Sequence, residues 1–213
     1  MDLYFSPLAC SLATRISLYE AGADAGFIEV DPKTKRIMTD GSDYTQVYQL
    51  GMVPAIRMDD GGLLTENAAI LQYVADRFPD ANLAPKSGIA RTRLHQWLCF
   101  IGTELHKGLF APLFDRKAPE GTAANVLAKA EPRLAYLNDH LSGREFLLDS
   151  FSVADAYLYT VLNWSMATPV KFDRYPAIAA YFDRLKKRPS VAKAFGEELA
   201  LYKAEQARHK QAA

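Results

Sequence analysis

The sequence predicts a two-domain protein in which a small mixed α/β domain precedes an all-helical domain. Up to about residue 80, short runs of strand-like alternation are interleaved with helical stretches, whereas from about residue 89 the apolar periodicity is helical almost throughout. The intervening segment contains Pro85 and ends near Gly88, two residues that interrupt regular structure. We therefore expect domains at residues 1–80 and 89–213, joined by a linker at 81–88.

The first domain is expected to form a four-stranded mixed sheet. Residues 3–5 and 27–30 are predicted strands on either side of a helix over 11–21, with Gly22 near the end of that helix. Residues 55–58 and 63–64 flank an Asp-Asp-Gly-Gly sequence that predicts a hairpin turn. A helix over 66–78 follows and ends before Pro79. The expected order is β-α-β followed by β-β-α.

The second domain is expected to contain about five helices. A long amphipathic helix over 89–110 is indicated by an apolar stripe with Trp97 beside it, formed by Leu94, Leu98, Ile101, Leu105 and Leu109. Further helices are predicted over 123–141, 152–166, 175–187 and 190–202. The tail from Lys203, rich in Ala, Gln and Lys, is expected to be a frayed helix or disordered.

A capping box is predicted where the helix over 152–166 begins. Ser152 stands at the cap position, and Asp155 three residues later reaches back to the Ser152 N–H. Phe151 is placed to pack against Ala156 or Tyr157. These residues indicate a structural function, the start of a buried helix, and not a catalytic one.

Composition excludes several classes of function. The 213 residues are 49% hydrophobic and 23% charged, and 25 basic side chains balance 25 acidic ones, so no global charge favours nucleic acid or an anionic membrane. Cys10 and Cys99 lie far apart, and neither a CxxC pair nor a Cys/His cluster is present, so we expect neither a disulfide nor a metal site. A leader segment and a membrane-spanning run are also missing from the sequence, which favours a cytoplasmic location.

Cys10 is the first candidate for chemistry. It lies between the first predicted strand and the first predicted helix, where we expect it to face unpaired backbone N–H groups. These groups and the partial positive charge of a helix start stabilise a thiolate. The alternative is a small apolar residue at the end of a strand.

Two further positions suggest a ligand with a peptide-like backbone. Val53-Pro54 is a candidate cis bond before the third strand, which would turn the Val53 N–H and C=O outward to pair with an extended ligand. Glu66 and Asn67 stand at a helix start, where a backbone N–H binds a carboxylate and Glu66 supplies the opposite charge. A ligand with an amino group beside a carboxylate matches this pair, although Asn67 as a plain N-cap fits the sequence equally well.

These motifs, in this order, resemble a glutathione transferase over essentially the whole chain, and most closely the bacterial beta class. The matching marks are the segment 6–12 around Cys10, Lys33-Thr34-Lys35-Arg36, Val53-Pro54, Thr65-Glu66-Asn67 and the capping-box segment 151–157. The resemblance implies a thioredoxin-like N-terminal domain, a helical C-terminal domain, a homodimer and glutathione as co-substrate. It also implies that Cys10 lies beside the glutathione sulfur, and we expect Cys10 and Ser11, together with backbone donors at the helix start, to lower the pKa of the glutathione thiol, so both are candidate catalytic residues.

The resemblance assigns the remaining glutathione contacts. Val53, with Pro54, pairs with the cysteinyl backbone, Glu66 and Asn67 hold the γ-glutamyl end, and Lys35 approaches the glycyl carboxylate. Lys107 also matches the family pattern, although a solvated surface charge is an equally ordinary reading of this lysine.

In the second domain, His106 matches a beta-class histidine near the glutathione sulfur. It shares a face of the long helix with Cys99, Gly102 and Thr103, whose small side chains leave room for a ligand between the domains. The expected electrophile-binding residues are hydrophobic, and each has core packing as its alternative: Phe110, Leu113, Phe114 and Trp164.

The sequence departs from the beta-class pattern at three places. The loop 48–52 lacks the usual Asn-Pro, Asn67 replaces a serine or glycine, and Leu148 replaces a glycine. The first departure puts contacts from that loop in doubt, and the second removes a hydroxyl but adds an amide.

The predicted activity is conjugation of the glutathione thiolate to a small hydrophobic electrophile, with thiol-disulfide exchange at Cys10 as a second possibility. A glutathione-dependent isomerase, dehalogenase or ether-cleaving enzyme, and a non-catalytic binding module on the same fold, remain as alternatives because substrate choice cannot be read from a fold.

Overall fold

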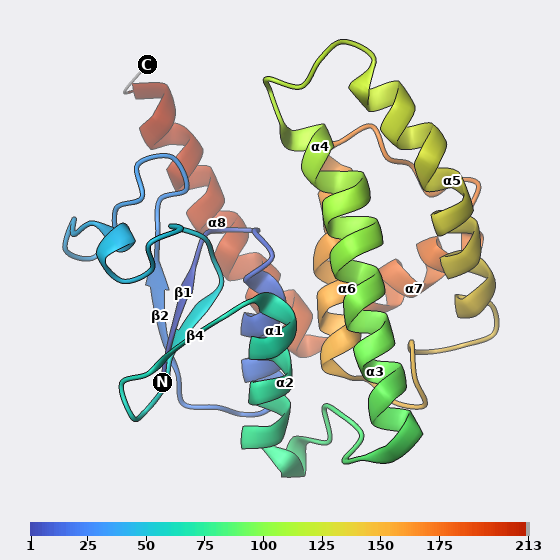
Figure 1. Ribbon diagram of the computed structural model, residues 1–213, viewed down its shortest axis with the longest axis horizontal. Coiled ribbons are helices and arrows are strands. Elements are labelled where there is room, and N and C mark those ends of the chain that lie inside the picture. The colour runs from blue at the N-terminus through green and yellow to red at the C-terminus, as the bar shows by residue number, and fades with distance from the viewer. Residues whose placement is uncertain (212–213) are drawn as a thin grey trace. The chain divides into compact units, whose positions relative to one another are not determined.

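The computed structural model describes residues 1–211, which divide into two compact units. The first unit combines Met1–Leu83 with the C-terminal segment that begins at Pro189, and the second unit is Ala84–Arg188. The last helix therefore belongs with the first unit, whereas the sequence pattern places it in a second domain over 89–213. Figure 1 shows the elements of both units.

The first unit contains the expected four-stranded mixed sheet. Its strands are β1 (Asp2–Phe5), β2 (Gly26–Glu29), β3 (Ala55–Arg57) and β4 (Leu63–Thr65), in the order β2-β1-β3-β4. β1 pairs parallel with β2 and antiparallel with β3, and Leu3 stands opposite Phe27 on one side and Ile56 on the other. Helix α1 (Leu12–Glu20) connects the parallel pair, and α2 (Asn67–Arg77) follows the hairpin of β3 and β4 (Figure 1). The order β-α-β, β-β-α is confirmed.

The two central strands, β1 and β3, place buried side chains on both faces of the sheet, because successive side chains of a strand point to opposite faces. Leu3, Phe5 and Ile56 belong to one hydrophobic cluster with residues of α1 and α2. Tyr4 and Ala55 belong to a second cluster under the irregular segment that follows β2. That segment includes the short 3-10 helix η1 (Tyr44–Gln46), and a second 3-10 turn, η2 (Pro79–Ala81), follows α2.

The final helix, α8 (Pro189–Gln211), corrects two expectations about the C-terminus. The segment from Lys203 to Gln211 is helical, not frayed or disordered, and α8 packs on α1 of the first unit. Its buried side chains are Val191, Ala194, Glu198 and Glu205. Two carboxylates in a buried stripe are unusual, because an ionised carboxyl group needs hydrogen bonds or an opposite charge when water is removed.

The second unit is entirely helical in its regular structure. Its elements are α3 (Gly88–Phe100), η3 (Ile101–Phe110), α4 (Ala111–Phe114), α5 (Thr122–Leu141), α6 (Val153–Asn163), η4 (Trp164–Ala167) and α7 (Pro176–Lys186). The predicted helix over 152–166 therefore ends as an α-helix at Asn163 and continues as a 3-10 turn. Among residues 1–211, no helix combines the length and the apolar character needed to cross a membrane.

The long helix predicted over 89–110 changes its hydrogen-bonding pattern halfway. Residues Ile101–Phe110 form a π-helix, in which the Ala111 N–H donates to the His106 carbonyl oxygen five residues earlier. A Cβ atom at Gly108 would lie 2.9 Å from the Thr103 carbonyl oxygen, so glycine permits this close turn. The predicted apolar stripe is nevertheless fully in the core. π-helical turns are rare and occur often at functional sites.

The capping box at α6 is confirmed. The Ser152 N–H donates to Asp155 Oδ2 at 2.9 Å, and the other carboxylate oxygen accepts from the Leu147 N–H at 2.9 Å and the Tyr181 hydroxyl at 2.7 Å. Burial raises the pKa of Asp155, while these hydrogen bonds oppose the shift. They join the start of α6 to the preceding loop and to α7.

Candidate functional site

Cys10 lies in the loop that joins β1 to α1, one residue before the helix N-cap, Ser11. Its thiol is half-buried and donates a hydrogen bond to the Val53 carbonyl oxygen, with 3.2 Å between Sγ and O. The expectation that Cys10 faces unpaired N–H groups needs correction for two groups at the start of α1, which donate to backbone carbonyl oxygens. The Leu12 N–H donates to Ala9 and the Ala13 N–H donates to Cys10 itself.

Ser11 shapes this loop from inside. Its side chain is fully buried, its Oγ donates to the Ser6 carbonyl oxygen at 3.2 Å, and it accepts from the Ser6 N–H at 3.3 Å. Both hydrogen bonds join the two ends of the Cys10 loop. They support a positioning function for Ser11.

Glu198 of α8 also holds the Cys10 loop, and the sequence analysis missed it. Its Oε2 accepts the Leu8 N–H at 2.7 Å, and its Oε1 lies 3.5 Å from Arg15 Nη1. Complete burial raises the pKa of Glu198 to about 8, against the opposing effects of the Leu8 and Arg15 contacts. The signal was present in the sequence: Val191, Ala194 and Glu198 share one helical face, so a carboxylate continues an apolar stripe.

The Val53-Pro54 bond is cis, as the sequence analysis suggested. Pro54 is buried and Val53 is half-buried, directly before β3. The Tyr44 hydroxyl donates to the carbonyl oxygen of Met52 at 2.9 Å and so holds the residue before Val53. Tyr44 itself is fully buried, which raises its pKa well above the ordinary value.

Glu66 and Asn67 stand at the start of α2 with contrasting environments. Glu66 is exposed, has a φ of +68° and occupies the N-cap position. Asn67 is the first residue of the helix and is 8% exposed, so the plain N-cap reading of Asn67 is wrong. Its Oδ1 accepts the Thr14 hydroxyl at 3.2 Å.

The amide nitrogen of Asn67 is a buried donor without a partner among the residues that the structure describes. Buried polar atoms are nearly always hydrogen-bonded, and an unmade hydrogen bond costs about 1–3 kcal/mol. An unpaired donor beside a helix N-terminus is therefore suited to an acceptor supplied by a ligand, such as a carboxylate.

Lys35 lies in the turn after β2 and has a φ of +57°. Its N–H donates to the Asp31 carbonyl oxygen at 3.0 Å, and its own carbonyl accepts the Tyr44 N–H at 2.9 Å. Its side chain covers Gly51, where an added Cβ would lie 3.3 Å from Lys35 Cδ. The atypical loop 48–52 thus supports Lys35 through a glycine that also has a positive φ, +59°.

In the second unit, His106 lies in η3 and is hydrogen-bonded to Tyr157 of α6, with 2.8 Å between Nδ1 and the hydroxyl oxygen. Gly102, one turn earlier, faces the same hydroxyl: a Cβ there would lie 3.7 Å from it. Burial, assisted by the Lys107 cation, lowers the pKa of His106 to about 4. The imidazole is therefore neutral near pH 7. Tyr157 entered the sequence analysis only as a packing partner of Phe151.

Two of the predicted hydrophobic site residues, and also His106, pack against the indole ring of a third, Trp164. Trp164 lies with its centroid 4.8 Å from His106, 5.8 Å from Phe110 and 5.8 Å from Phe114. Phe110 is fully buried, whereas 45% of Phe114 is exposed. Leu113 is half-buried and Lys107 is exposed. Cys99 and Thr103, expected on the same face as His106, are both exposed.

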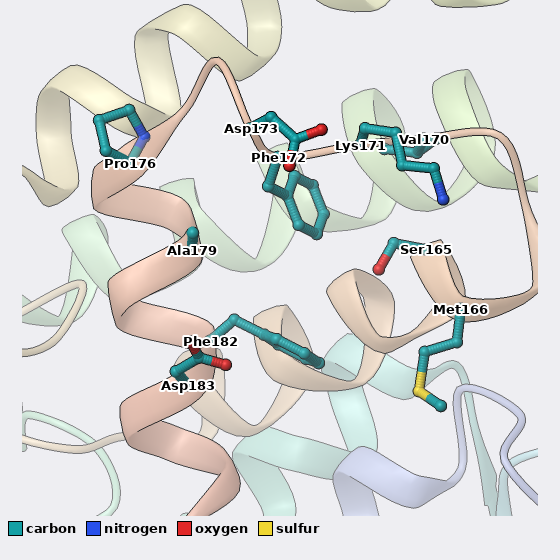
Figure 2. A pocket seen from close by; sticks show the side chains of 10 residues that line it. All are labelled: Ser165, Met166, Val170, Lys171, Phe172, Asp173, Pro176, Ala179, Phe182 and Asp183. Atoms are coloured by element: carbon teal, nitrogen blue, oxygen red, sulfur yellow. The ribbon is translucent and has the colours of Figure 1, made fainter.

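The second unit also carries an open pocket of about 570 Å³ that none of the predicted site residues lines. Figure 2 shows side chains from η4, from the segment after it and from α7, among them Phe172, Phe182 and Lys171. Asp173 and Asp183 give the pocket acidic groups as well, so its charge does not select one kind of ligand.

Comparisons with known proteins identify the family of this chain. The family models "Glutathione S-transferase, N-terminal domain" and "Glutathione S-transferase, C-terminal domain" match residues 2–76 and 120–184. Glutathione S-transferase GstA of Escherichia coli O157:H7 is 44% identical over 200 residues, which cover 93% of this chain and 98% of the relative. Glutathione S-transferase GST-4.5 of Xanthomonas campestris is 34% identical with the same coverage of both chains.

Solved structures give the same result. A sphingomonad glutathione S-transferase complexed with glutathione superposes with a TM-score of 0.88 at 40% identity, covering 93% of this chain and 98% of the other. The beta class glutathione S-transferase of Sphingomonas chungbukensis gives the same TM-score, identity and coverage. The chain thus belongs to the glutathione S-transferase family, and its structural neighbours include the bacterial beta class.

Proposed function

We propose that this protein binds glutathione in its first unit and transfers the glutathionyl group to a small hydrophobic electrophile. The observation that carries the proposal is the unpartnered, buried amide nitrogen of Asn67 beside the exposed carboxylate of Glu66. The γ-glutamyl end of glutathione has a carboxylate to accept from Asn67 and an ammonium group to pair with Glu66. Both halves of an amino-acid group are therefore matched by adjacent residues.

The remaining contacts follow from the family resemblance and from the loops described above. The Val53 backbone pairs with the cysteinyl part of the ligand as an added strand would. Lys35 binds the glycyl carboxylate, with its stem supported on Gly51. These contacts bring the glutathione sulfur to the Cys10 loop. Lys107, which is exposed, has only the family pattern in its favour.

The chemistry requires the glutathione thiol to lose its proton. A free thiol has a pKa of about 8.5, so a shift of about two units makes it largely a thiolate at pH 7. The Cys10 thiol, whose proton is at present donated to Val53, is the nearest side-chain donor expected for that thiolate. The thiol proton passes to solvent water, the thiolate forms a C–S bond to the electrophile, and the leaving group departs with its electron pair.

The second unit supplies the surface for the electrophile in this proposal. Phe114, Leu113 and Trp164 provide apolar area, and Phe110 supports the Trp164 ring from the core. Neutral His106, hydrogen-bonded to Tyr157, provides a polar group that carries no charge near pH 7.

Thiol-disulfide exchange at Cys10 is a second candidate, favoured by a half-buried thiol that is not part of a disulfide. In this reaction the Cys10 thiolate attacks the glutathione sulfur of a mixed disulfide, a new S–S bond joins Cys10 to glutathione, and the other sulfur leaves as a thiolate. A second glutathione, as its thiolate, then attacks the glutathione sulfur bound to Cys10; the new S–S bond gives glutathione disulfide, and Cys10 leaves as a thiolate.

Exchange of Asn67 for Asp tests the proposal. Asn67→Asp replaces the unpartnered N–H donor with an oxygen of the same size and leaves Oδ1 to accept the Thr14 hydroxyl. We expect the Kd for glutathione, measured by isothermal titration calorimetry, to rise at least tenfold, because two carboxylates then face each other. The control Asn67→Ser restores the small hydroxyl donor usual in the family and should bind within a few fold of the wild type.

Equal glutathione affinity in the wild type and in Asn67→Asp would refute this ligand geometry. A wild-type protein that is neither retained on immobilised glutathione nor stabilised by it would refute glutathione binding altogether, in favour of a binding module for another ligand.

A further inference from the structure

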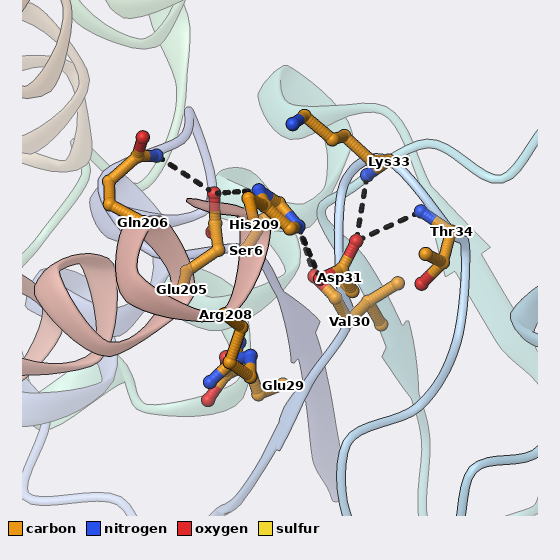
Figure 3. Close-up of polar contacts among 10 residues, drawn as sticks. All are labelled: Ser6, Glu29, Val30, Asp31, Lys33, Thr34, Glu205, Gln206, Arg208 and His209. Atoms are coloured by element: carbon orange, nitrogen blue, oxygen red, sulfur yellow. Dashed lines mark hydrogen bonds and ion pairs between the residues drawn. The ribbon is translucent and has the colours of Figure 1, made fainter. Parts of the chain in front are cut away.

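Asp31, directly after β2, organises the turn that carries Lys35. Its Oδ1 accepts the backbone N–H groups of Lys33 and Thr34 at 2.9 Å each, as Figure 3 shows. Its carbonyl oxygen accepts the Lys35 N–H at 3.0 Å, and its own N–H donates to the Arg36 carbonyl oxygen at 2.9 Å. Only the second carboxylate oxygen of Asp31 is left to bind outside the turn.

That oxygen is bound by the last turns of α8. His209 Nε2 lies 2.8 Å from Asp31 Oδ2, and the side chains of both residues are nearly buried, 12% and 6% exposed (Figure 3). The other ring nitrogen lies 3.8 Å from Glu205 Oε1. A carboxylate therefore flanks each nitrogen of the imidazole, and Arg208 adds an ion pair with Glu29 at 2.9 Å.

The hydrogen bonds on Asp31 favour its ionised form. Burial raises the pKa of Asp31, but the hydrogen bonds from Thr34, His209 and Lys33 outweigh burial and hold the pKa below its ordinary value. The same strand end is joined to the Cys10 loop, because the Ser6 hydroxyl donates to the Val30 carbonyl oxygen at 2.6 Å. The C-terminal helix, the Lys35 turn and the Cys10 loop are thus connected by direct contacts.

We propose that His209 is a positioning residue for glutathione, which acts by fixing the Asp31 turn so that Lys35 is held ready for the glycyl carboxylate. This inference rests on the proposed function. Lys35 has a left-handed backbone conformation, which a free loop would populate little. A turn held in that conformation before the ligand arrives loses less conformational freedom on binding, and this preorganisation increases affinity.

A purely structural function for His209 makes a different prediction. If the Asp31–His209 contact only attaches the end of α8, its loss affects every ligand of the first unit alike. If it acts through Lys35, its loss affects only ligands that carry the glycyl carboxylate. Glutathione and its glycyl monoethyl ester differ in this one group, so the pair of ligands separates the two cases.

The experiment measures Kd for both ligands by calorimetry in the full chain, in His209→Ala and in His209→Gln. We expect His209→Ala to weaken glutathione roughly fivefold or more, the usual size of one lost hydrogen bond, and to leave the Kd of the ester unchanged. His209→Gln should recover most of the affinity, because its amide can donate to Asp31. Lys210→Ala, which removes an exposed cation from the neighbouring position, should bind both ligands as the wild type does.

Asp31→Asn provides a second variant, should His209→Ala fail to fold. It keeps an oxygen for the Lys33 and Thr34 N–H groups but loses the carboxylate that faces His209, and we expect the same selective loss of glutathione affinity.

Three outcomes overturn the inference. Equal weakening of both ligands makes His209 merely structural, and unchanged glutathione affinity in His209→Ala removes its function altogether; in both cases glutathione binding by the wild type leaves the proposed function intact. Failure of the wild type to bind glutathione overturns the proposed function, and the inference fails with it.

Discussion

Among single residues, Cys10 is a candidate for two functions, hydrogen-bond donation to the glutathione thiolate and thiol-disulfide exchange. Its half-buried thiol donates a hydrogen bond to the Val53 carbonyl oxygen, which orients the sulfur. In the proposed conjugation it would donate a hydrogen bond to the glutathione thiolate, and in the proposed exchange it would attack a disulfide as a thiolate. Disulfide exchange requires the Cys10 sulfur as nucleophile, whereas in conjugation the nucleophile is the glutathione sulfur.

Cys10→Ala separates these functions. We expect disulfide exchange with a glutathione mixed disulfide to disappear, because no other described residue of the loop 6–11 carries a thiol. Conjugation to an aryl halide should keep a substantial part of its rate, since the nucleophile is then the glutathione sulfur. Steady-state assays of both reactions measure the difference, with Cys99→Ala as control. Unchanged rates in both assays would show that Cys10 has no catalytic function.

Gly51 is a second residue whose substitution should affect glutathione binding separately from stability. Gly51→Ala places a Cβ 3.3 Å from Lys35 Cδ and forces alanine into a φ of +59°, which costs about 1 kcal/mol of stability. Gly41→Ala is the matched control, because it has a φ of +72° and open space around the added atom. We expect both variants to lose similar stability in urea unfolding, whereas only Gly51→Ala weakens glutathione binding. Equal Kd values would show that the loop 48–52 does not support Lys35.

Among the elements, sequence periodicity predicted the regular strands and helices. The strands, α1, α2 and the capping box at α6 follow from alternation, helical spacing and turn residues. The π-helix over Ile101–Phe110 could not be predicted in this way. Its apolar stripe fits an α-helix equally well, and only the hydrogen bonds between residues five apart distinguish the two helix types. Periodicity also did not predict the buried contacts of α8, because Glu198 contacts Leu8 and His209 contacts Asp31 across more than 170 positions of sequence.

The buried carboxyl group of α8 gives the stability of the protein a pH dependence. The pKa of Glu198 is raised from 4.5 to about 8, so between these values the folded protein holds a proton that the unfolded chain has released. Stability therefore falls as the pH rises through this window. Glu198→Gln keeps an oxygen acceptor for the Leu8 N–H and cannot ionise, so we expect a smaller loss of unfolding free energy between about pH 6 and about pH 9.

Urea unfolding at both pH values measures this difference. Glu197→Gln is the control, because Glu197 lies next to Glu198 on the same helix with a side chain that is 39% exposed. A Glu198→Gln variant with the same pH dependence as the wild type would contradict the assignment of this effect to Glu198.

At the scale of the whole molecule, the chain leaves the first unit after Leu83 and returns to it at Pro189. Local sequence patterns cannot reveal this return, because a helix looks the same whichever unit it joins. The return has a consequence for folding: α8 packs on α1 and supplies the carboxylates that face the buried Arg15.

A chain ending at residue 188 should therefore lose its cooperative fold in the first unit. Removal of α8 exposes the apolar face of α1 and leaves the buried Arg15 cation without the oxygen atoms of Glu197 and Glu198, and a buried charge without partners is strongly destabilising. Circular dichroism during urea titration measures the loss. A truncated chain that unfolds in one transition at the wild-type urea concentration would show that α8 is dispensable.

Glutathione binding and the lowered pKa of the glutathione thiol are both tested by the ultraviolet absorbance of the bound thiolate, measured as a function of pH. The difference spectrum between complex and separate components should show a thiolate that titrates about two units below free glutathione, near pH 6.5. Cys10→Ala in complex with glutathione identifies which sulfur absorbs. A bound thiol that titrates as free glutathione does, or no binding at all, would contradict the proposed function.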